Sequence, residues 1–267
     1  MLNTVATHGH VHEYPQRQRP TSTPTPAGFD VSWAKTWPEV REAQRLRYRV
    51  FALEMGARVP SRQHGLDADE FDSYCDHLLV REPRDGEVIG TYRVLTPQQA
   101  IAAGGLYSDH EFDLTNLQAL RPCMAELGRA CVDARFRQGG AMLALWSALA
   151  DYMLAQQMEC MIGCCSVPLH QGGHTAAALW RELSKAHMAD PCWHVCPLLP
   201  LPLHLLGDGC AADPPPLLKG YLRLGAKLLG PPAWDSEFGC ADFPVLLSLD
   251  NLPARYRRHF LQHGNAN

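Results

Sequence analysis

The stretch "MAELGRACVDARFRQGGAMLALWSAL", residues 124–149, joins a strand pattern to a helix pattern. Residues 124–132 read as a strand, and residues 139–156 repeat apolar side chains at helical spacing. The junction between them holds Arg135, Arg137, Gln138, Gly139 and Gly140. A helix N-terminus presents unpaired N–H groups, glycine admits a ligand close to the backbone, and arginine pairs with phosphate. The junction therefore predicts a phosphate cradle, with a solvated turn as the alternative.

Strand and helix patterns also alternate along the rest of the chain. The expected strands are an edge strand at 29–34, a hairpin at 77–95 and strands at 160–167 and 242–250. The expected helices cover 37–57, 174–188, 215–232 and 251–262. This order predicts an α/β fold whose sheet has an antiparallel part and a parallel part. No G-x-G-x-x-G opens a helix and there is no Walker loop, so a Rossmann or P-loop fold is not expected.

Composition excludes several classes of protein. The 267 residues carry a net charge of -4, so no basic field is available for nucleic acid. No stretch reaches the length of a bilayer span, and no secretory signal opens the chain, which predicts a cytoplasmic protein with reduced cysteines. Residues 1–28, rich in Pro, Thr, His and Gln, predict a disordered tail before a single domain at 29–267. The "CWHVC" spacing at 192–196 is not a standard zinc pair, so no metal is expected.

Four segments carry a resemblance to known enzymes. They are "RLRYRVFALEMG" (45–56), "LDADEFDSYCDHLLV" (66–80), "VIGTYRVL" (88–95) and "MAELGRACV" (124–132). Their order resembles the acyl-homoserine-lactone autoinducer synthases and, more closely, the hemolysin-like branch of the GNAT N-acyltransferases. The segment at 215–260 has no counterpart in the synthases and resembles the end of the L-ornithine Nα-acyltransferases. Those enzymes move a 3-hydroxy fatty acyl group from acyl carrier protein to the α-amine of ornithine, the first step of ornithine lipid synthesis.

The resemblance covers roughly Phe29 to Phe260 and implies a GNAT-type mixed sheet flanked by helices, with a C-terminal extension at about 200–267. It implies that the phosphopantetheine of acyl carrier protein is part of the donor and that no other cofactor is bound. The phosphate would lie at the Arg135–Gly140 junction, where "RFRQGGA" is a compressed form of the family's R/Q-x-x-G-x-G/A pattern. Tyr48, Phe51 and Trp146 are the expected lining of the acyl pocket.

Catalysis is expected on the central strand, at Glu126 and Arg129. Glu126 is a candidate base for the attacking amine, because burial raises the pKa of a carboxylate. The alternative is that Glu126 only pairs with Arg129 or Arg93. In GNAT folds the donor to the oxyanion is usually a backbone N–H at a bulge, and Gly128, which stands where the synthases have serine, permits one.

The acidic loop offers Asp67, Asp69 and Asp72 beside Arg93, a charge pattern that would match ornithine. The alternatives are a solvated loop, or a lock on the arginines at 45–49. We expect a split between the two roles, and lysine or glutamine stays open as the acceptor.

A basic amphipathic segment and two rival functions complete the expectations. Lys219, Arg223 and Lys227 recur every four residues, as on a helix that meets anionic lipid or acidic carrier protein. Peripheral association with the inner membrane is therefore expected, with an ordinary surface helix as the alternative. The rival functions are an acyl-homoserine-lactone synthase using S-adenosylmethionine and a catalytically silent protein that binds lipid or carrier.

Overall fold

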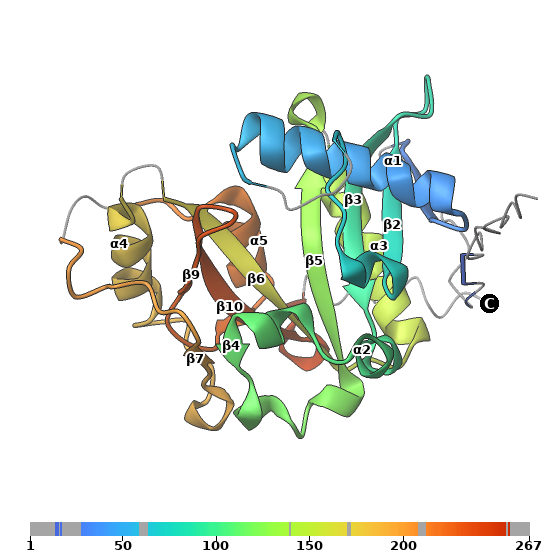
Figure 1. Cartoon of the computed structure of the whole chain (residues 1–267). Coiled ribbons are helices and arrows are strands. Elements are labelled where there is room, and N and C mark those ends of the chain that lie inside the picture. Colours follow the sequence, from blue (N-terminus) through green and yellow to red (C-terminus); the bar gives the residue numbers. More distant parts are fainter. Residues whose placement is uncertain are drawn as a thin grey trace, which may run out of the picture.

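A computed structural model gives the structure of the chain and describes residues 14–15, 17, 28–58, 64–138, 140–169, 172–207, 212–254 and 256. Eight strands of the described chain form one sheet, in the order β1-β2-β3-β5-β6-β10-β8 with β9 beside β10 (Figure 1). The helices lie on both faces of this sheet, which confirms the α/β class and the mixed, helix-flanked architecture.

The element bounds follow the sequence patterns closely in the first two thirds of the chain. The sheet strands are β1 Asp30–Trp33, β2 Asp76–Arg81, β3 Val88–Leu95, β5 Met124–Val132, β6 Cys160–Pro168, β8 Lys227–Leu228, β9 Ala233–Asp235 and β10 Cys240–Ser248. The helices are α1 Trp37–Tyr48, α2 Pro97–Ala103, α3 Ala141–Ala155, α4 His174–Leu183 and α5 Pro216–Arg223. A separate two-stranded ribbon pairs β4 Phe112–Asp113 with β7 Cys196–Pro197.

The two central strands, β5 and β6, are parallel but stay paired over only three residues. Their register runs from Met124 opposite Cys160 to Glu126 opposite Ile162, although both strands continue for six more residues. Figure 1 shows them diverging from this junction. At the parting point the Leu127 carbonyl would lie 2.6 Å from a Cβ on Gly163, so only glycine fits there. The splay opens a gap in the middle of the sheet.

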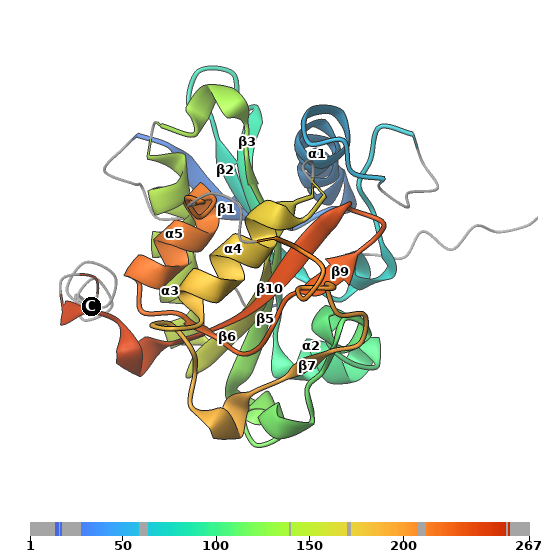
Figure 2. The same ribbon diagram turned by 90° about the vertical axis from the view of Figure 1, so that its left-hand side faces the viewer.

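Two apolar layers cover the sheet because strand side chains alternate between its faces. Leu79, Val88 and Cys131 pack with α1 on one face. Leu78, Tyr92 and the other alternate residues pack with α3, α4 and α5 on the opposite face, which Figure 2 shows from the front.

The helix α1 begins at a full capping box, in which Thr36 and Glu39 bond each other's backbone N–H. It does not run on to residue 57 as its periodicity predicts. At Arg49 the backbone widens into a π-helix, Arg49–Glu54, which turns the following side chains away from the direction set by α1.

The C-terminal part departs most from the sequence prediction. The helix expected over 215–232 ends at Arg223, because Gly225 takes φ +93° and turns the chain. Lys227 then pairs with Leu246 in the sheet. The single basic helix face expected from Lys219, Arg223 and Lys227 is therefore wrong. The expected closing helix lies mostly outside the described residues.

Part of the expected N-terminal tail contacts the domain. Tyr14 is buried and its ring meets Trp37 edge-on at 5.2 Å, while Arg17 pairs with Asp76 at 3.1 Å. The remainder of 1–28, except Pro15 and Gly28, lies outside the described residues, and the disordered tail stays a prediction there. Within the described chain, no helix has the length and apolar character to cross a bilayer.

Candidate active site

The gap between β5 and β6 leads into a cavity of about 1150 Å³ that reaches both faces of the sheet. On the α1 face its wall is charged, and we call this the acidic end: Arg93, Glu111, Glu126, Arg129, Asp235 and Asp242. On the α3 face its wall is hydrophobic, and we call this the apolar end: Tyr92, Leu127, Trp146, Met161, Tyr221 and Leu247. Strand alternation produces the contrast, because Tyr92 and Arg93 are neighbours that face opposite ways.

A β-bulge in β5 lies at the centre of this cavity. Thr91 pairs with Cys131 and Arg93 pairs with Gly128, so Tyr92 faces two residues, Arg129 and Ala130. Arg129 takes φ +52°, a left-handed conformation that is unusual for a residue with a side chain. The bulge follows directly after Gly128, where the sequence permits one.

Glu126 is buried on the acidic end and is bound by the turn at Tyr107–His110. Its Oε2 accepts the Tyr107 N–H at 2.6 Å, and its Oε1 accepts the Ser108 N–H at 2.8 Å and the Ser108 hydroxyl at 2.5 Å. Burial raises the pKa of Glu126, although these hydrogen bonds and Arg93 oppose the shift. Within the described part of the chain, Arg93 and Arg129 form ion pairs with the acidic loop and not with Glu126, so the geometry does not support the pairing alternative.

The acidic loop forms a buried lock on α1. The Nε of Arg47 donates to Asp67 at 3.0 Å. Its two terminal nitrogens each donate to one oxygen of Asp72 at 2.9 Å. Gln44 adds a bond to Asp72 at 2.8 Å. Burial would raise the pKa of Asp72, yet Arg47 and Arg93 hold that pKa well below its usual range. Asp67 and Asp72 are thus engaged within the protein and do not line the cavity, which corrects their expected role as ornithine ligands.

Asp69 joins this lock to the cavity. It accepts from Arg93 at 2.5 Å and from Arg129 at 3.2 Å, and Arg93 also reaches Asp72 at 3.0 Å. Arg93 and Arg129 line the cavity and Asp69 lies behind them. The Arg129 guanidinium is held between the rings of Tyr107 and Phe238, at 4.9 and 4.7 Å. The acids therefore position two arginines that line the cavity, and a role for the acidic loop in binding substrate stays a prediction.

A second group of acidic side chains, Glu111, Asp235 and Asp242, lines the same end of the cavity. Burial, together with the nearby negative charge of Asp242, raises the pKa of Glu111 to about 9. One carboxyl oxygen of Glu111 is buried with no hydrogen-bond partner. Burial also raises the pKa of Asp242 to about 6, with Asp235 nearby. Glu111, Asp235 and Asp242 thus make a pocket in which a cation would be stabilised.

The predicted phosphate cradle is only partly assembled around the cavity. Arg137 and Gln138 line it, and Arg137 makes an exposed pair with Glu54. Gly140 caps α3 with φ +83°. Arg135 pairs instead with Asp133 at 2.9 Å and Glu87 at 2.8 Å, away from the cavity, which corrects its expected role. Gly139 lies outside the described residues.

Two of the three expected acyl-pocket residues line the cavity. Phe51 does so from the π-helix, and Trp146 does so from α3, where its ring stacks on Tyr221 at 6.0 Å. Tyr48 is the last residue of α1 and meets His64 edge-on at 5.7 Å. It does not line the cavity, because the π-helix that begins at Arg49 reorients the chain between Tyr48 and Phe51.

The cavity is also lined by cysteine thiols, among them Cys164 and Cys240. Burial raises the pKa of Cys164, which lines the cavity, far above its usual value, so its thiol stays protonated and is a poor nucleophile. Among the described residues, Asp235, Cys240 and Asp242 could place ligand atoms within 4.8 Å of one another. The prediction of no metal remains a prediction.

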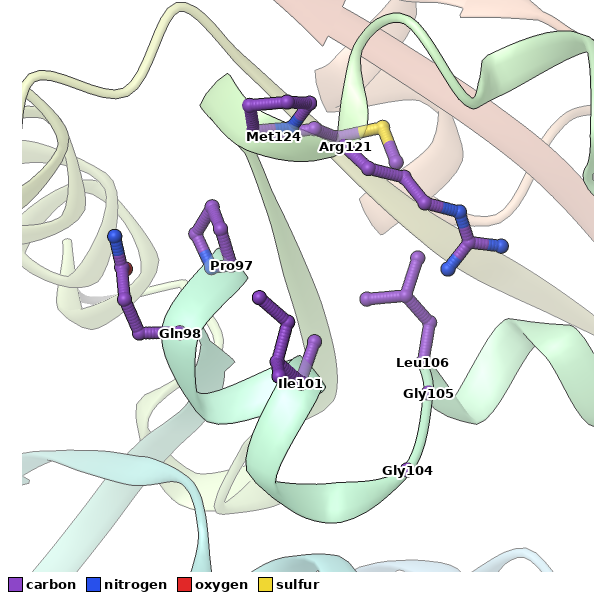
Figure 3. Close-up of a pocket in the computed structure, with 10 residues that line it drawn as sticks. Pro97, Gln98, Ile101, Gly104, Gly105, Leu106, Arg121 and Met124 are labelled. Carbon is purple, nitrogen blue, oxygen red and sulfur yellow. The ribbon is translucent and has the colours of Figure 1, made fainter.

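A second hollow, of about 470 Å³, lies between α2 and the turn at Arg121–Cys123 (Figure 3). Pro97, Ile101 and Leu106 form its wall, and the Arg121 guanidinium beside it is paired with Asp109. None of the residues predicted from the sequence as site residues line it.

Comparisons with known proteins identify the relatives of this chain. The model of the acetyltransferase (GNAT) domain matches residues 46–147. The L-ornithine N(alpha)-acyltransferase of Rhodobacter capsulatus is 36% identical over 256 residues, covering 88% of this chain and 95% of that protein. That of Agrobacterium fabrum is 35% identical, covering 87% and 85%. A solved CoA-dependent acyl-homoserine lactone synthase, with SAM and isopentyl-CoA, has a TM-score of 0.51 at 16% identity, over 86% of this chain and 85% of that one.

The chain belongs to the L-ornithine N(alpha)-acyltransferase family.

This membership confirms the resemblance given by the four sequence segments, and the solved synthase confirms the GNAT-type fold. The chain is therefore an N-acyltransferase. Four further residues of this acyltransferase line the cavity without being predicted as site residues from the sequence: Tyr92, Glu111, Asp235 and Asp242. No local motif marks them, since β4, the β9–β10 hairpin and the β3 register bring them to the cavity from distant segments.

Proposed function

We propose that this acyltransferase moves a 3-hydroxy fatty acyl group from acyl carrier protein to the α-amine of L-ornithine, giving lyso-ornithine lipid. The observation that carries the proposal is the cavity through the sheet, with charges of both signs at one end and apolar walls at the other. An amino acid with two ammonium groups and a carboxylate fits the first end, and a fatty acyl chain fits the second. The names of the relatives, at 31–36% identity, support the same acceptor.

The acceptor would lie across the acidic end in one orientation. Arg129, with Arg93 beside it, would pair with the ornithine carboxylate. Glu111 and Asp242 would receive the δ-ammonium, which leaves the α-amine towards Glu126. This arrangement pairs each charge of ornithine with a residue of opposite charge that already lines the cavity.

The reaction requires the α-ammonium to lose a proton before its nitrogen can attack. Glu126, directly or through one water, would take that proton, and the raised pKa of its buried carboxyl suits the role. The nitrogen then adds to the thioester carbon, and a backbone N–H at the β5 bulge would stabilise the resulting oxyanion. That addition forms the C–N bond. Collapse then re-forms the carbonyl and breaks the C–S bond, and the departing pantetheine thiolate takes up the proton that the nitrogen loses as it becomes the amide. Direct transfer is part of the proposal, because burial raises the pKa of the Cys164 thiol and so disfavours an acyl-enzyme at that residue.

The donor would enter from the α3 side. Arg137, Lys219 and Arg223 line the cavity there, and they would meet the phosphate of phosphopantetheine and the acidic carrier protein. The Arg137–Glu54 pair is exposed, so exchanging Glu54 for phosphate costs little. A location in the cytoplasm with contact to an anionic membrane surface is part of the same proposal, because the product is amphiphilic.

Mass spectrometry tests the proposal. Purified protein is incubated with 3-hydroxyacyl-carrier protein and ornithine, with acyl-CoA as a parallel donor and lysine and glutamine as parallel acceptors. Formation of Nα-(3-hydroxyacyl)ornithine from the carrier-protein donor is expected. Product from another amine corrects the acceptor, and no product from any pair supports the silent binding protein instead.

A further inference from the structure

One polar group at the apolar end has no partner and no role in the steps above. The Tyr92 side chain is 1% exposed and lines the cavity, and its hydroxyl oxygen makes no hydrogen bond. Tyr92 belongs to the same hydrophobic core cluster as Leu127, Met161 and Leu247, whose side chains carry no strong hydrogen-bonding group. Phenylalanine would fill the same volume without burying an unsatisfied polar atom, so the hydroxyl is unfavourable in the empty cavity.

The position of Tyr92 indicates which part of a ligand would meet it. Tyr92 lies opposite Arg129 and Ala130, the two residues of the β5 bulge. Its side chain lies on the α3 face, whereas Arg93 and Glu126 lie at the acidic end, where the proposed acceptor would bind. The thioester would lie at the bulge, so Tyr92 is beside the first carbons of the acyl chain. The thioester oxygen is met by the backbone N–H, which leaves the Tyr92 hydroxyl for another oxygen close to it.

We propose that the Tyr92 hydroxyl selects acyl donors that carry an oxygen substituent near the thioester, such as a 3-hydroxyl. A tyrosine hydroxyl can donate to that oxygen or accept from it. An unsubstituted chain leaves the hydroxyl buried and unpaired, so binding such a chain is penalised relative to a hydroxylated one. This inference rests on the proposed function and assigns the residue that sets its donor preference.

A second buried donor at the same end has a different assignment. The indole Nε1 of Trp146 also has no hydrogen-bond partner, but its ring is fixed by stacking on Tyr221 and by close packing on Gly220. An indole N–H only donates, so it cannot distinguish a hydroxyl from a carbonyl oxygen. Tyr92, which is next to the bulge, is the residue that reads the substituent.

The test is Tyr92→Phe with two carrier-protein donors of equal chain length, one 3-hydroxylated and one unsubstituted, competing for saturating ornithine. The wild type is expected to prefer the hydroxylated donor. The variant should lose about tenfold in kcat/KM for that donor, the equivalent of one hydrogen bond, and should keep or improve its rate with the unsubstituted one. Tyr74→Phe, which removes a hydroxyl outside the cavity, is the matched control and should leave both rates unchanged.

Direct binding separates this inference from the proposed function. Calorimetric titration with 3-hydroxyacyl- and acyl-pantetheine of equal length measures the same preference without turnover, and a thermal melt establishes that the variant is folded. If the wild type makes no acylornithine but Tyr92→Phe abolishes a preference for the hydroxylated ligand, the function fails and the inference stands. If the variant keeps the wild-type preference, or the wild type has none, Tyr92 does not read the chain and the inference is wrong.

Discussion

The acidic end and the apolar end of the cavity are built from the same strands, yet charged side chains line the first and hydrophobic side chains line the second. At the acidic end, burial and the charge of Asp242 raise the pKa of Glu111, and one oxygen of Glu111 accepts no hydrogen bond. The six residues that define the apolar end carry no charge, and two polar atoms among them, on Tyr92 and Trp146, are buried without hydrogen-bond partners. Alternation along β3 and β5 places these ends on opposite faces, and the splay between β5 and β6 connects them.

From this difference we expect the acidic end to select the acceptor and the apolar end to select the acyl chain. Electrostatic attraction at the acidic end depends on pH and on the charge of the acceptor. Packing at the apolar end depends on chain length and shape. Glu126 lies on the acidic face at the last paired position of the splay, where the two substrates would meet.

The most severe test of this comparison is Glu126→Gln, at the junction of the two ends. We expect kcat to fall about 100-fold or more, because an amide cannot take the proton of the attacking ammonium. Stopped-time product assays across pH check this. The wild-type rate should rise with pH as Glu126 ionises, and the variant should lose that rise. A wild-type kcat in the variant would leave Glu126 only as the residue that positions the Tyr107–His110 turn.

The next test removes one charge from the acidic end. Asp242→Asn should raise KM for ornithine about 10- to 100-fold, the value of a charge-assisted hydrogen bond, and change KM for the donor little. Norvaline, which is ornithine without the δ-amine, is the matched acceptor. The wild type should strongly prefer ornithine and the variant should prefer it much less. An unchanged preference would move the δ-ammonium elsewhere.

The acidic end also predicts how ornithine binding varies with pH. The pKa of Asp242 is about 6 in the empty cavity because burial favours its neutral form. Below that pH the carboxyl is protonated and cannot pair with an ammonium, so the affinity should fall more steeply with decreasing pH there than it does above that pH. Because the pKa of Glu111 is about 9, ornithine should displace its proton near neutral pH. Calorimetry in buffers of different ionisation enthalpy measures that release, which Glu111→Gln should abolish.

The proposed role of the apolar end can be tested by a substitution that changes only the shape of the cavity. A Cβ on Gly220 would lie 2.2 Å from the Trp146 ring, so Gly220→Ala must push that ring into the cavity. Each methylene that the shortened space excludes should cost about fourfold in kcat/KM, since a buried methylene is worth about 0.8 kcal/mol. A donor series of increasing chain length should show the optimum shift to shorter chains with ornithine KM unchanged. An unshifted optimum would place the chain away from Trp146.

The central strand, its bulge and the α3 junction could be predicted from the sequence, because each has a local pattern that the fold preserves. Glu126, Arg93 and Arg129 were found in the same way, from short motifs on single strands. Glu111 and Asp242 could not be found so, because their proximity depends on the β10–β6 register and on the turn before β4. The helix at 215–232 was overextended because apolar periodicity continues past Gly225, whose backbone ends it. Local patterns thus predict elements, and long-range pairing decides which charges meet.

The smallest expected effect separates two arginines that the sequence treats alike. Arg137 lines the cavity, pairs with the exposed Glu54 and donates from Nε to the Val132 carbonyl, whereas Arg135 is bound by Asp133 and Glu87 outside the cavity. Arg137→Ala should therefore raise KM for the carrier-protein donor about threefold to tenfold, as expected for one solvent-screened contact to phosphate, and leave ornithine KM unchanged. Arg135→Ala is the matched control and should leave both unchanged. Because the contact is electrostatic and exposed, added salt should reduce the difference between wild type and Arg137→Ala. Equal effects of the two substitutions would show that the donor phosphate meets the whole junction, as its sequence suggests, and that the ion pairs of Arg135 open when the donor binds.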